Sequence, residues 1–457
     1  MDVSVRDRGG FINRIPRRIS AFSHARQSLK RRLLLLGFIF VAFTVRVAVR
    51  CYFGSVDFWV NSYTFYFDIA QKMAAGTGIS FWEGPLTAGR VPLYPAFLAA
   101  VTSGQKVFLP IVFAQSLIGA GTVVCAALLA GEMFGRTAAI TAAAITAVYP
   151  YYVVHDTALQ ETSLFTLLTA LAVVLLLRVR RSGSGVTAAC AGLALGAAVL
   201  TRSSLAPFAF LGPLWLAIPG VFRAGPWRQA FWAAAICAGA VALVVSPWLV
   251  WSYRLTGPAE RGPPPGYALW LGNNAYTFSH YPYESMDRSR DVAGDALGPQ
   301  DNAEIDALGA NEAAVDQWFR RKGLEYIREH PWLTFGNAFR KLGAAFGWLP
   351  SPRKSFWPNL VHSLAYGFVM TLGLWGMWAG RRHWREHLVF YALFVSFATI
   401  TALFWGHTSH RTFLDVYWII FAAGMLQGLQ RKYFARFASM GSSNPRFEGS
   451  SQLGGTA

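Results

Sequence analysis

Five polar residues between the first two long apolar runs of the chain share the spacing of an α-helix. Asp57, Asn61, Thr64, Asp68 and Lys72 follow one another at intervals of four, three, four and four residues. Side chains three and four positions apart lie on one face of a helix, so the segment predicts a polar stripe with two carboxylates. Carboxylates that face water or a cavity can take part in proton transfer, which makes Asp57 and Asp68 candidate catalytic residues. An ordinary amphipathic helix with a solvated face explains the same spacing.

A third candidate carboxylate, Glu161, stands at the first residue of an apolar run. The N-terminus of a helix favours an anion, so helix capping accounts for this residue as well as a catalytic role does. A carboxylate that packs inside a membrane bundle is costly, and its presence then indicates function. Glu161 is therefore a third candidate catalytic residue, with helix capping as an equal alternative.

Several cations lie in the links that we expect on the same side of the membrane as these carboxylates. Such cations suit an anionic lipid headgroup or a departing phosphate, which arginine can bind with two parallel hydrogen bonds. Taken singly, each is more often a side chain that anchors a helix at the membrane surface. The candidate substrate-binding residues are Arg90, Arg202, Lys341, His410 and Arg411.

The sequence contains no motif that indicates a resident metal or cofactor. The histidines show no metal-ligand spacing, and the four cysteines are scattered without the pattern of a zinc site or a disulfide framework. No phosphate-cradling loop, dinucleotide fingerprint or serine-nucleophile elbow stands out. We therefore predict no metal site.

Membrane-spanning helices must position these groups. The chain is 54% hydrophobic and 14% charged, whereas soluble domains average about 25% charged residues. A span of the hydrocarbon layer needs about 20 apolar residues, and ten runs approach or exceed that length. They are Leu33–Val49, Pro110–Gly131, Thr137–Pro150, Glu161–Leu177, Val186–Leu200, Leu205–Val221, Ala230–Trp251, Pro358–Ala379, His387–Trp405 and Thr412–Gln430.

The positive charge of the chain predicts its orientation. The net charge is +18, and the arginines cluster before the first run and in alternate short links, such as 178–181 and 381–385. Short cytoplasmic links carry an excess of arginine and lysine, so we expect both ends of the chain in the cytoplasm. The same location makes anionic lipid, and not nucleic acid, the expected partner of these charges.

The sequence thus predicts an all-α polytopic membrane protein with about ten spans. Its segments would be a basic cytoplasmic tail 1–32, a transmembrane region 33–251 with a first outer loop 50–109, a large outer loop 252–357, transmembrane helices 358–430, and a cytoplasmic tail 431–457 that is expected to be disordered. We expect amphipathic helices at the membrane surface in the first outer loop. In the large loop, Asn311–Glu329 and Trp332–Trp348 read as further amphipathic helices.

Several short motifs of the outer segments resemble one family of membrane enzymes. They are Tyr66…Ile69-Ala70…Gly76…Gly78, Arg90-Val91-Pro92-Leu93-Tyr94-Pro95, Pro150 with Glu161, Gly192…Gly196…Leu200-Thr201-Arg202, Leu271-Gly272-Asn273-Asn274, His330-Pro331 with Lys341, and His410-Arg411. Together they are similar to motifs of the GT-C glycosyltransferases, in particular the family 39-like group that includes protein O-mannosyltransferases and the lipid A aminoarabinose transferase. The resemblance covers roughly Leu33 to Gln430.

The chain departs from that family at one position. The family usually has an acidic residue, implicated in catalysis, four positions before the tyrosine of the first-loop motif. Here that position is Ser62, with Asn61 beside it. Asp57 or Asp68 would have to substitute, or the enzyme uses a different acceptor, or it has lost activity.

The resemblance implies a GT-C-like bundle and a hexosyl or pentosyl transferase. A polyprenyl-phosphate-linked sugar would be the donor, and a hydroxyl group of a glycan, lipid or protein would be the acceptor. The site would face outward from the inner cell membrane. The chemistry requires no cofactor, although carboxylates and phosphate could share a divalent metal. A transporter of lipid-linked sugar or polysaccharide, and a membrane assembly subunit, are the alternative interpretations.

Overall fold

The computed structural model describes residues 15–60, 63–80, 89–218, 221, 223–256, 266–281, 286–309, 311–348 and 355–441. Its regular elements over these residues are α-helices and short 3₁₀ turns. A helix occupies each of the ten predicted apolar runs, which confirms the all-α class. These helices are α1 (Ile15–Val60), α4 (Leu109–Phe134), α5 (Arg136–Val148), α7 (Thr162–Ser182), α8 (Gly185–Thr201), α9 (Ala206–Ala217), α10 (Trp227–Thr256), α16 (Phe356–Ala379), α17 (Trp384–Leu403) and α19 (Asp415–Gly441).

Seven segments of the described chain are long and apolar enough to cross a membrane, and they belong to α1, α4, α7, α10, α16, α17 and α19. Helices α5, α8 and α9 are apolar but shorter. The chain is therefore a multi-pass membrane protein. Which end of the bundle faces the cytoplasm, and how the chain divides into inner and outer segments, stay predictions.

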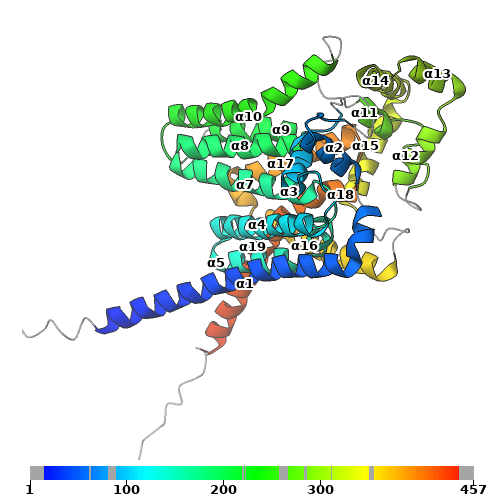
Figure 1. The fold of residues 1–457 in the computed structure, drawn as a ribbon. Coiled ribbons are helices and arrows are strands. Elements are labelled where there is room, and N and C mark those ends of the chain that lie inside the picture. Colours follow the sequence, from blue (N-terminus) through cyan, green and yellow to red (C-terminus); the bar gives the residue numbers. More distant parts are fainter. Residues whose placement is uncertain are drawn as a thin grey trace, which may run out of the picture.

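The helices form a layered bundle (Figure 1). Helix α8 packs against α7 and α10, α7 packs against α4, and α19 packs against α4, α5 and α16. Small residues allow the closest approach: a Cβ at Gly192 of α8 would lie 2.2 Å from the carbonyl oxygen of Cys237 in α10. Backbones that pack this closely are typical of helices that associate within lipid.

The remaining helices belong to the links. They are α2 (Phe65–Ala74), α3 (Leu93–Thr102), α6 (Pro150–His155), α11 (Gly266–Gly272), α12 (Met286–Asp295), α13 (Pro299–Ala307), α14 (Glu312–Glu329), α15 (Pro331–Phe346) and α18 (Thr408–Arg411). Helices α14 and α15 confirm the two helices predicted in the large loop. Figure 1 shows α2 and α11 to α15 gathered at one end of the bundle, whereas α1 and α19 extend from the other end toward the chain termini.

Two sequence predictions about helix boundaries are wrong. The polar stripe from Asp57 to Lys72 does not lie on one helix, because α1 ends at Val60 and α2 begins at Phe65. Helix α1 also kinks at Gly54, whose φ of 79° is in the left-handed region that favours glycine. Residues 431–441, which the sequence assigned to the disordered tail, belong to helix α19, which continues to Gly441. Asn61, Ser62 and the end of that tail lie outside the described residues.

Candidate functional site

The predicted residues Glu161 and Arg202 form an ion pair at the end of the bundle that carries α2. The guanidinium donates to Glu161 Oε1 from Nε at 3.0 Å and from the second amino group at 2.7 Å. The side chains are 13% and 15% exposed, so water has limited access to the pair. A third nitrogen of Arg202 donates to the carbonyl oxygen of His410 at 3.3 Å. Three of the predicted site residues therefore meet at one point.

Local topology explains this meeting. Glu161 is the residue before α7, and Arg202 is the residue after α8. The two helices pack against each other, and a tight link with Gly183 at φ 63° joins them. The link makes the helices antiparallel, so the start of α7 lies beside the end of α8. The ring of Phe165 supports the pair, with the Arg202 guanidinium 4.7 Å from its centroid.

Tyr66 of α2 is the third member of this site. Its ring is buried, and its hydroxyl donates a hydrogen bond to Glu161. Burial and the charge of Glu161 raise the pKa of Tyr66, so the hydroxyl stays a donor. Burial alone would raise the pKa of Glu161, but the charge and hydrogen bonds of Arg202 and the hydrogen bond of Tyr66 lower it. Glu161 is consequently an ionised acceptor and a weak base.

Arg90 lies close to the same group and is the accessible cation there. Its charge acts on Tyr66 together with those of Glu161 and Arg202. Its side chain is exposed, and the guanidinium lies 5.1 Å from the ring centroid of Phe65. Within the described part of the chain Arg90 has no carboxylate partner at ion-pair distance. We call Tyr66, Arg90, Glu161, Arg202 and His410 the Glu161 cluster.

The two candidate bases have different surroundings. Asp57 accepts a hydrogen bond from Arg50 at 2.8 Å, and its side chain is 35% exposed. Asp68 lies on α2 and makes no ion pair with the described residues. Partial burial raises the pKa of Asp68, against the opposing charges of Lys106 and Lys72. No arginine pairs with Asp68 among the described residues, whereas the Arg50 guanidinium occupies Asp57.

Lys341 and Arg411 are buried and have partners from the protein itself. The ammonium of Lys341 donates to Asn273 Oδ1 at 3.1 Å and to the carbonyl oxygen of Ala402 at 3.0 Å. Burial lowers the pKa of Lys341 to about 8. Arg411 donates to both oxygens of Asp415, at 2.7 and 3.0 Å. These contacts tie α15 to α17 and α18 to α19, and the phosphate-binding role of both residues stays a prediction.

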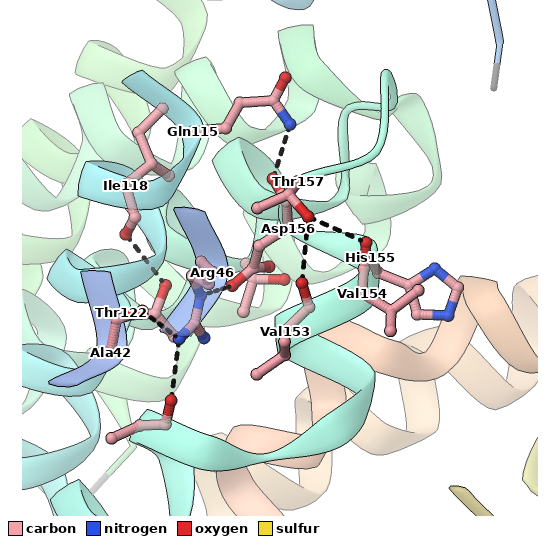
Figure 2. Close-up of polar contacts among 12 residues, drawn as sticks. Ala42, Arg46, Gln115, Ile118, Thr122, Val153, Val154, His155, Asp156 and Thr157 are labelled. Carbon is pink, nitrogen blue, oxygen red and sulfur yellow. Dashed lines mark hydrogen bonds and ion pairs between the residues drawn. The ribbon is translucent and has the colours of Figure 1, made fainter. Parts of the chain in front are cut away.

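A buried ion pair joins Arg46 of α1 to Asp156, which lies in the link between α6 and α7 (Figure 2). Sequence reasoning missed this pair. Arg46 of α1 donates from Nε to Asp156 at 2.9 Å, and both side chains are almost completely buried. Another Arg46 nitrogen donates to the carbonyl oxygens of Ala42 and Ala147, at 3.1 and 3.0 Å. The available clue was a charged residue inside the apolar run 33–49, because such residues pair inside the bundle.

Helix α4 completes this support. The amide of Gln115 donates to the carbonyl oxygens of Asp156 and Ala158, at 2.6 and 2.7 Å. Gly119, one turn further along α4, leaves room for the ion pair: a Cβ there would lie 2.5 Å from Arg46 Nε and 2.6 Å from Asp156 Oδ2. The link that ends at Glu161 is thus held by α1 and α4.

No group of three or more His, Cys, Asp or Glu side chains that could hold a metal ion occurs among the described residues.

One family model matches the chain. Residues 89–251 match dolichyl-phosphate-mannose-protein mannosyltransferase, and this range contains Arg90, Glu161 and Arg202. No curated protein matches the chain at a significant level.

Solved structures of an archaeal oligosaccharyltransferase from Archaeoglobus fulgidus resemble the chain. The enzyme AglB in complex with an inhibitory peptide and a dolichol-phosphate has 14% identity and a TM-score of 0.51, and covers 91% of this chain and 52% of its own. The apo form has 14% identity and a TM-score of 0.53, with 90% and 52% covered. A complex with zinc and sulfate has 15% identity and a TM-score of 0.50, with 89% and 52% covered.

The likeness at this low identity concerns the fold. The chain spans about half the length of the archaeal enzyme, and its helices follow that enzyme's arrangement over most of the chain. The family match and the structural likeness together show the GT-C type of fold that the sequence motifs suggested.

Proposed function

We propose that this protein is a glycosyltransferase that moves a sugar from a polyprenyl-phosphate carrier to an acceptor hydroxyl group at the Glu161 cluster. One observation carries the proposal: the mannosyltransferase family match runs over 89–251 and includes three charged members of the cluster, which the fold brings together from separate links. The archaeal structures add support, because one of them holds a dolichol-phosphate on the same fold.

The proposed reaction is a direct displacement. The acceptor oxygen forms a bond to the anomeric carbon, the bond between that carbon and the phosphate oxygen breaks, and polyprenyl phosphate leaves with the electron pair. The acceptor proton goes to a carboxylate. Attack from the side opposite the phosphate inverts the anomeric centre. The lipid tail of the donor would lie between helices, with its headgroup at the links.

We propose Asp68 as the base, with Asp57 as its alternate, which reverses the order suggested by the sequence. Burial raises the pKa of Asp68, whereas the Arg50 ion pair occupies Asp57. Glu161 is unsuited to the role because its pKa is lowered and both Arg202 and Tyr66 donate to it. Its supporting function would be to hold these two side chains in place.

Arg90 is proposed to offset the charge that develops on the departing phosphate. A cation that meets charge formed in the transition state accelerates the reaction more than one that is already neutralised. Arg90 is exposed and has no carboxylate partner among the described residues, whereas Arg202 directs its donors to Glu161 and His410. Arg202 would therefore shape the site and Arg90 would contact the phosphate.

The acceptor is proposed to be a hydroxyl group of a glycan, lipid or protein on the outer side of the inner membrane. The archaeal structure with zinc and sulfate makes a divalent metal compatible with this fold. Asp57 and Asp68 are the carboxylates that would share such a metal with the donor phosphate. No observation favours a transporter.

Radiolabelled sugar transfer from a polyprenyl-phosphate donor tests the proposal. Membranes with the wild-type protein should yield labelled acceptor and free polyprenyl phosphate in equal amounts. Asp68→Asn should lower the rate by about 100-fold, because general base catalysis contributes that much or more, and Asp57→Asn should have a smaller effect. Intact donor moved across the membrane without cleavage would support a transporter and overturn the proposal.

A further inference from the structure

A groove at the end of the bundle opposite the Glu161 cluster has the form of a lipid site. It lies between α1, α4 and α5 and has a volume of about 520 Å³. Most of its lining is apolar, including Leu35, Ile39, Val124, Leu128 and Ile140. In a membrane such a groove accepts a hydrocarbon chain without loss of hydrogen bonds, since neither the chain nor these side chains require any.

One end of the groove is positively charged. Arg32, Arg136 and Arg181 line that end together with a single acid, Glu132. Arg181 contacts Glu132 at 3.3 Å, which leaves the other two arginines uncompensated. Both are exposed, and neither has an ion-pair partner in the part of the chain that the structure describes. Arg136 is also the first residue of α5, where the helix dipole adds positive potential.

The length of the groove fits one leaflet of a bilayer. Its lining on α4 runs from Val123 to Glu132, which is about 13 Å at 1.5 Å per residue. Half of the hydrocarbon core is about 15 Å thick. An acyl chain that starts at the arginines would therefore end near the middle of the membrane, as the chain of a bilayer lipid does.

The groove is separate from the proposed reaction site. Arg181 lies near the end of α7, and Glu161 stands before its start. The 21 residues of α7 separate the two points by about 31 Å along the helix. A phosphate bound at the arginines is thus too far from the Glu161 cluster to react there.

We propose that this groove binds one anionic phospholipid, with its phosphate at Arg32 and Arg136 and an acyl chain along α1, α4 and α5. The charge imbalance selects an anionic headgroup over a zwitterionic one. The bound lipid would fill the space between α1 and the rest of the bundle and hold α1 in place. Because α1 also carries Arg46, the lipid would support the link that ends at Glu161 from the other end of the bundle.

Native mass spectrometry of the purified full chain tests this site. Dioleoyl phosphatidylglycerol and dioleoyl phosphatidylcholine are the probes, added to delipidated protein in detergent. The wild-type protein should retain one phosphatidylglycerol in preference to phosphatidylcholine. Each arginine near a membrane surface contributes about 1 kcal/mol, so the double variant Arg32→Gln/Arg136→Gln should bind phosphatidylglycerol about 30-fold more weakly. Arg228→Gln removes an exposed arginine of α10 and should leave binding unchanged.

A second pair of variants tests the apolar part and keeps the test valid if charge changes alter the fold. Leu128→Trp fills the groove and should weaken the binding of both lipids. Leu117→Trp should weaken the binding of neither, because Leu117 lies on α4 outside the groove and is 66% exposed. Equal retention of the two lipids by the wild-type protein would overturn the proposal. Unchanged phosphatidylglycerol binding in both the double variant and Leu128→Trp would overturn it as well.

Discussion

Two carboxylates of one short link, Asp156 and Glu161, each pair with an arginine, but their surroundings differ. Asp156 meets Arg46 in the interior, where the side chains are 2% and 0% exposed. Glu161 meets Arg202 at the end of the bundle, next to a tyrosine hydroxyl and the exposed Arg90. We call Arg46–Asp156 the inner pair and Glu161–Arg202 the outer pair, by their depth in the bundle. The inner pair has no access to ligand and can only stabilise the fold, whereas the outer pair lies next to an exposed cation. We therefore expect a structural role for the Arg46–Asp156 pair and, under the proposed function, a supporting role in catalysis for the Glu161–Arg202 pair.

The largest expected effect concerns the inner pair. Arg46→Met leaves Asp156 buried without its partner, and breaking a buried ion pair on one side costs about 3–5 kcal/mol of unfolding free energy. Thermal or denaturant unfolding in detergent measures this loss. The double variant Arg46→Met/Asp156→Leu removes both charges and should regain most of the stability. If the double variant is no more stable than Arg46→Met, the pair is not the source of the loss.

Glu161→Gln should separate activity from stability at the outer pair. Glutamine keeps an oxygen that accepts from Tyr66 and Arg202 but removes the charge that orients them. Displaced site groups typically cost about 100-fold in rate, so kcat/KM for sugar transfer should fall by roughly that factor. The loss of unfolding free energy should be less than half of that in Arg46→Met. A variant with normal transfer and a large loss of stability would make both pairs structural.

Gly119→Ala tests the space around the inner pair with the smallest side-chain change. The new methyl group would lie 2.5 Å from Arg46 Nε, and overpacking of this kind costs about 1–3 kcal/mol. Gly239→Ala on α10 is the matched control, because a Cβ there meets nothing within 4 Å. Unfolding of the two variants should differ by that amount. Equal stabilities would mean that the Arg46–Asp156 pair has room to move.

Acid titration should change the contributions of the two pairs to the free energy of unfolding in opposite directions. This is the smallest of the expected effects. The pKa of Glu161 is lowered from its ordinary 4.5, so its contribution to stability is present above that pH and is lost as the pH falls through the folded value. Burial outweighs the charge of Arg46 and raises the pKa of Asp156 above 3.8. The contribution of Asp156 to the free energy of unfolding therefore increases as the pH falls through its pKa in the folded protein. Unfolding from pH 7 to 3, with Glu161→Gln and Asp156→Asn as references, measures each slope. Slopes of the same sign would contradict the assignment.

The sequence predicted the spanning helices well because the bilayer demands long apolar runs, and few other structures have them. It also predicted that Glu161 and Arg202 would lie on the same side, because α7 and α8 are consecutive spans. Their direct contact depends on the tight link at Gly183 and on packing, which no spacing rule contains.

Three features were beyond sequence reasoning for physical reasons. The stripe from Asp57 to Lys72 has helical spacing throughout, yet α1 ends before α2 begins. Spacing alone cannot reveal such a break, because the intervals between the polar residues stay the same across it. The partner of Arg46 is Asp156, 110 residues away in the chain, and only tertiary packing brings the two together. Lys341 shows the same limit, since an expected surface cation is buried against Asn273.

The transfer rate of one variant tests whether Arg90 contacts the departing phosphate in the proposed reaction. Arg90→Gln removes the exposed cation of the Glu161 cluster, and Arg228→Gln removes an exposed arginine from α10. Labelled sugar transfer from a polyprenyl-phosphate donor is measured in membranes with equal amounts of each protein. The rate of Arg90→Gln should lie about 100-fold below wild type, because a charge that stabilises the departing phosphate is lost. Arg228→Gln should keep the wild-type rate. Equal rates for the two variants would contradict this role of Arg90.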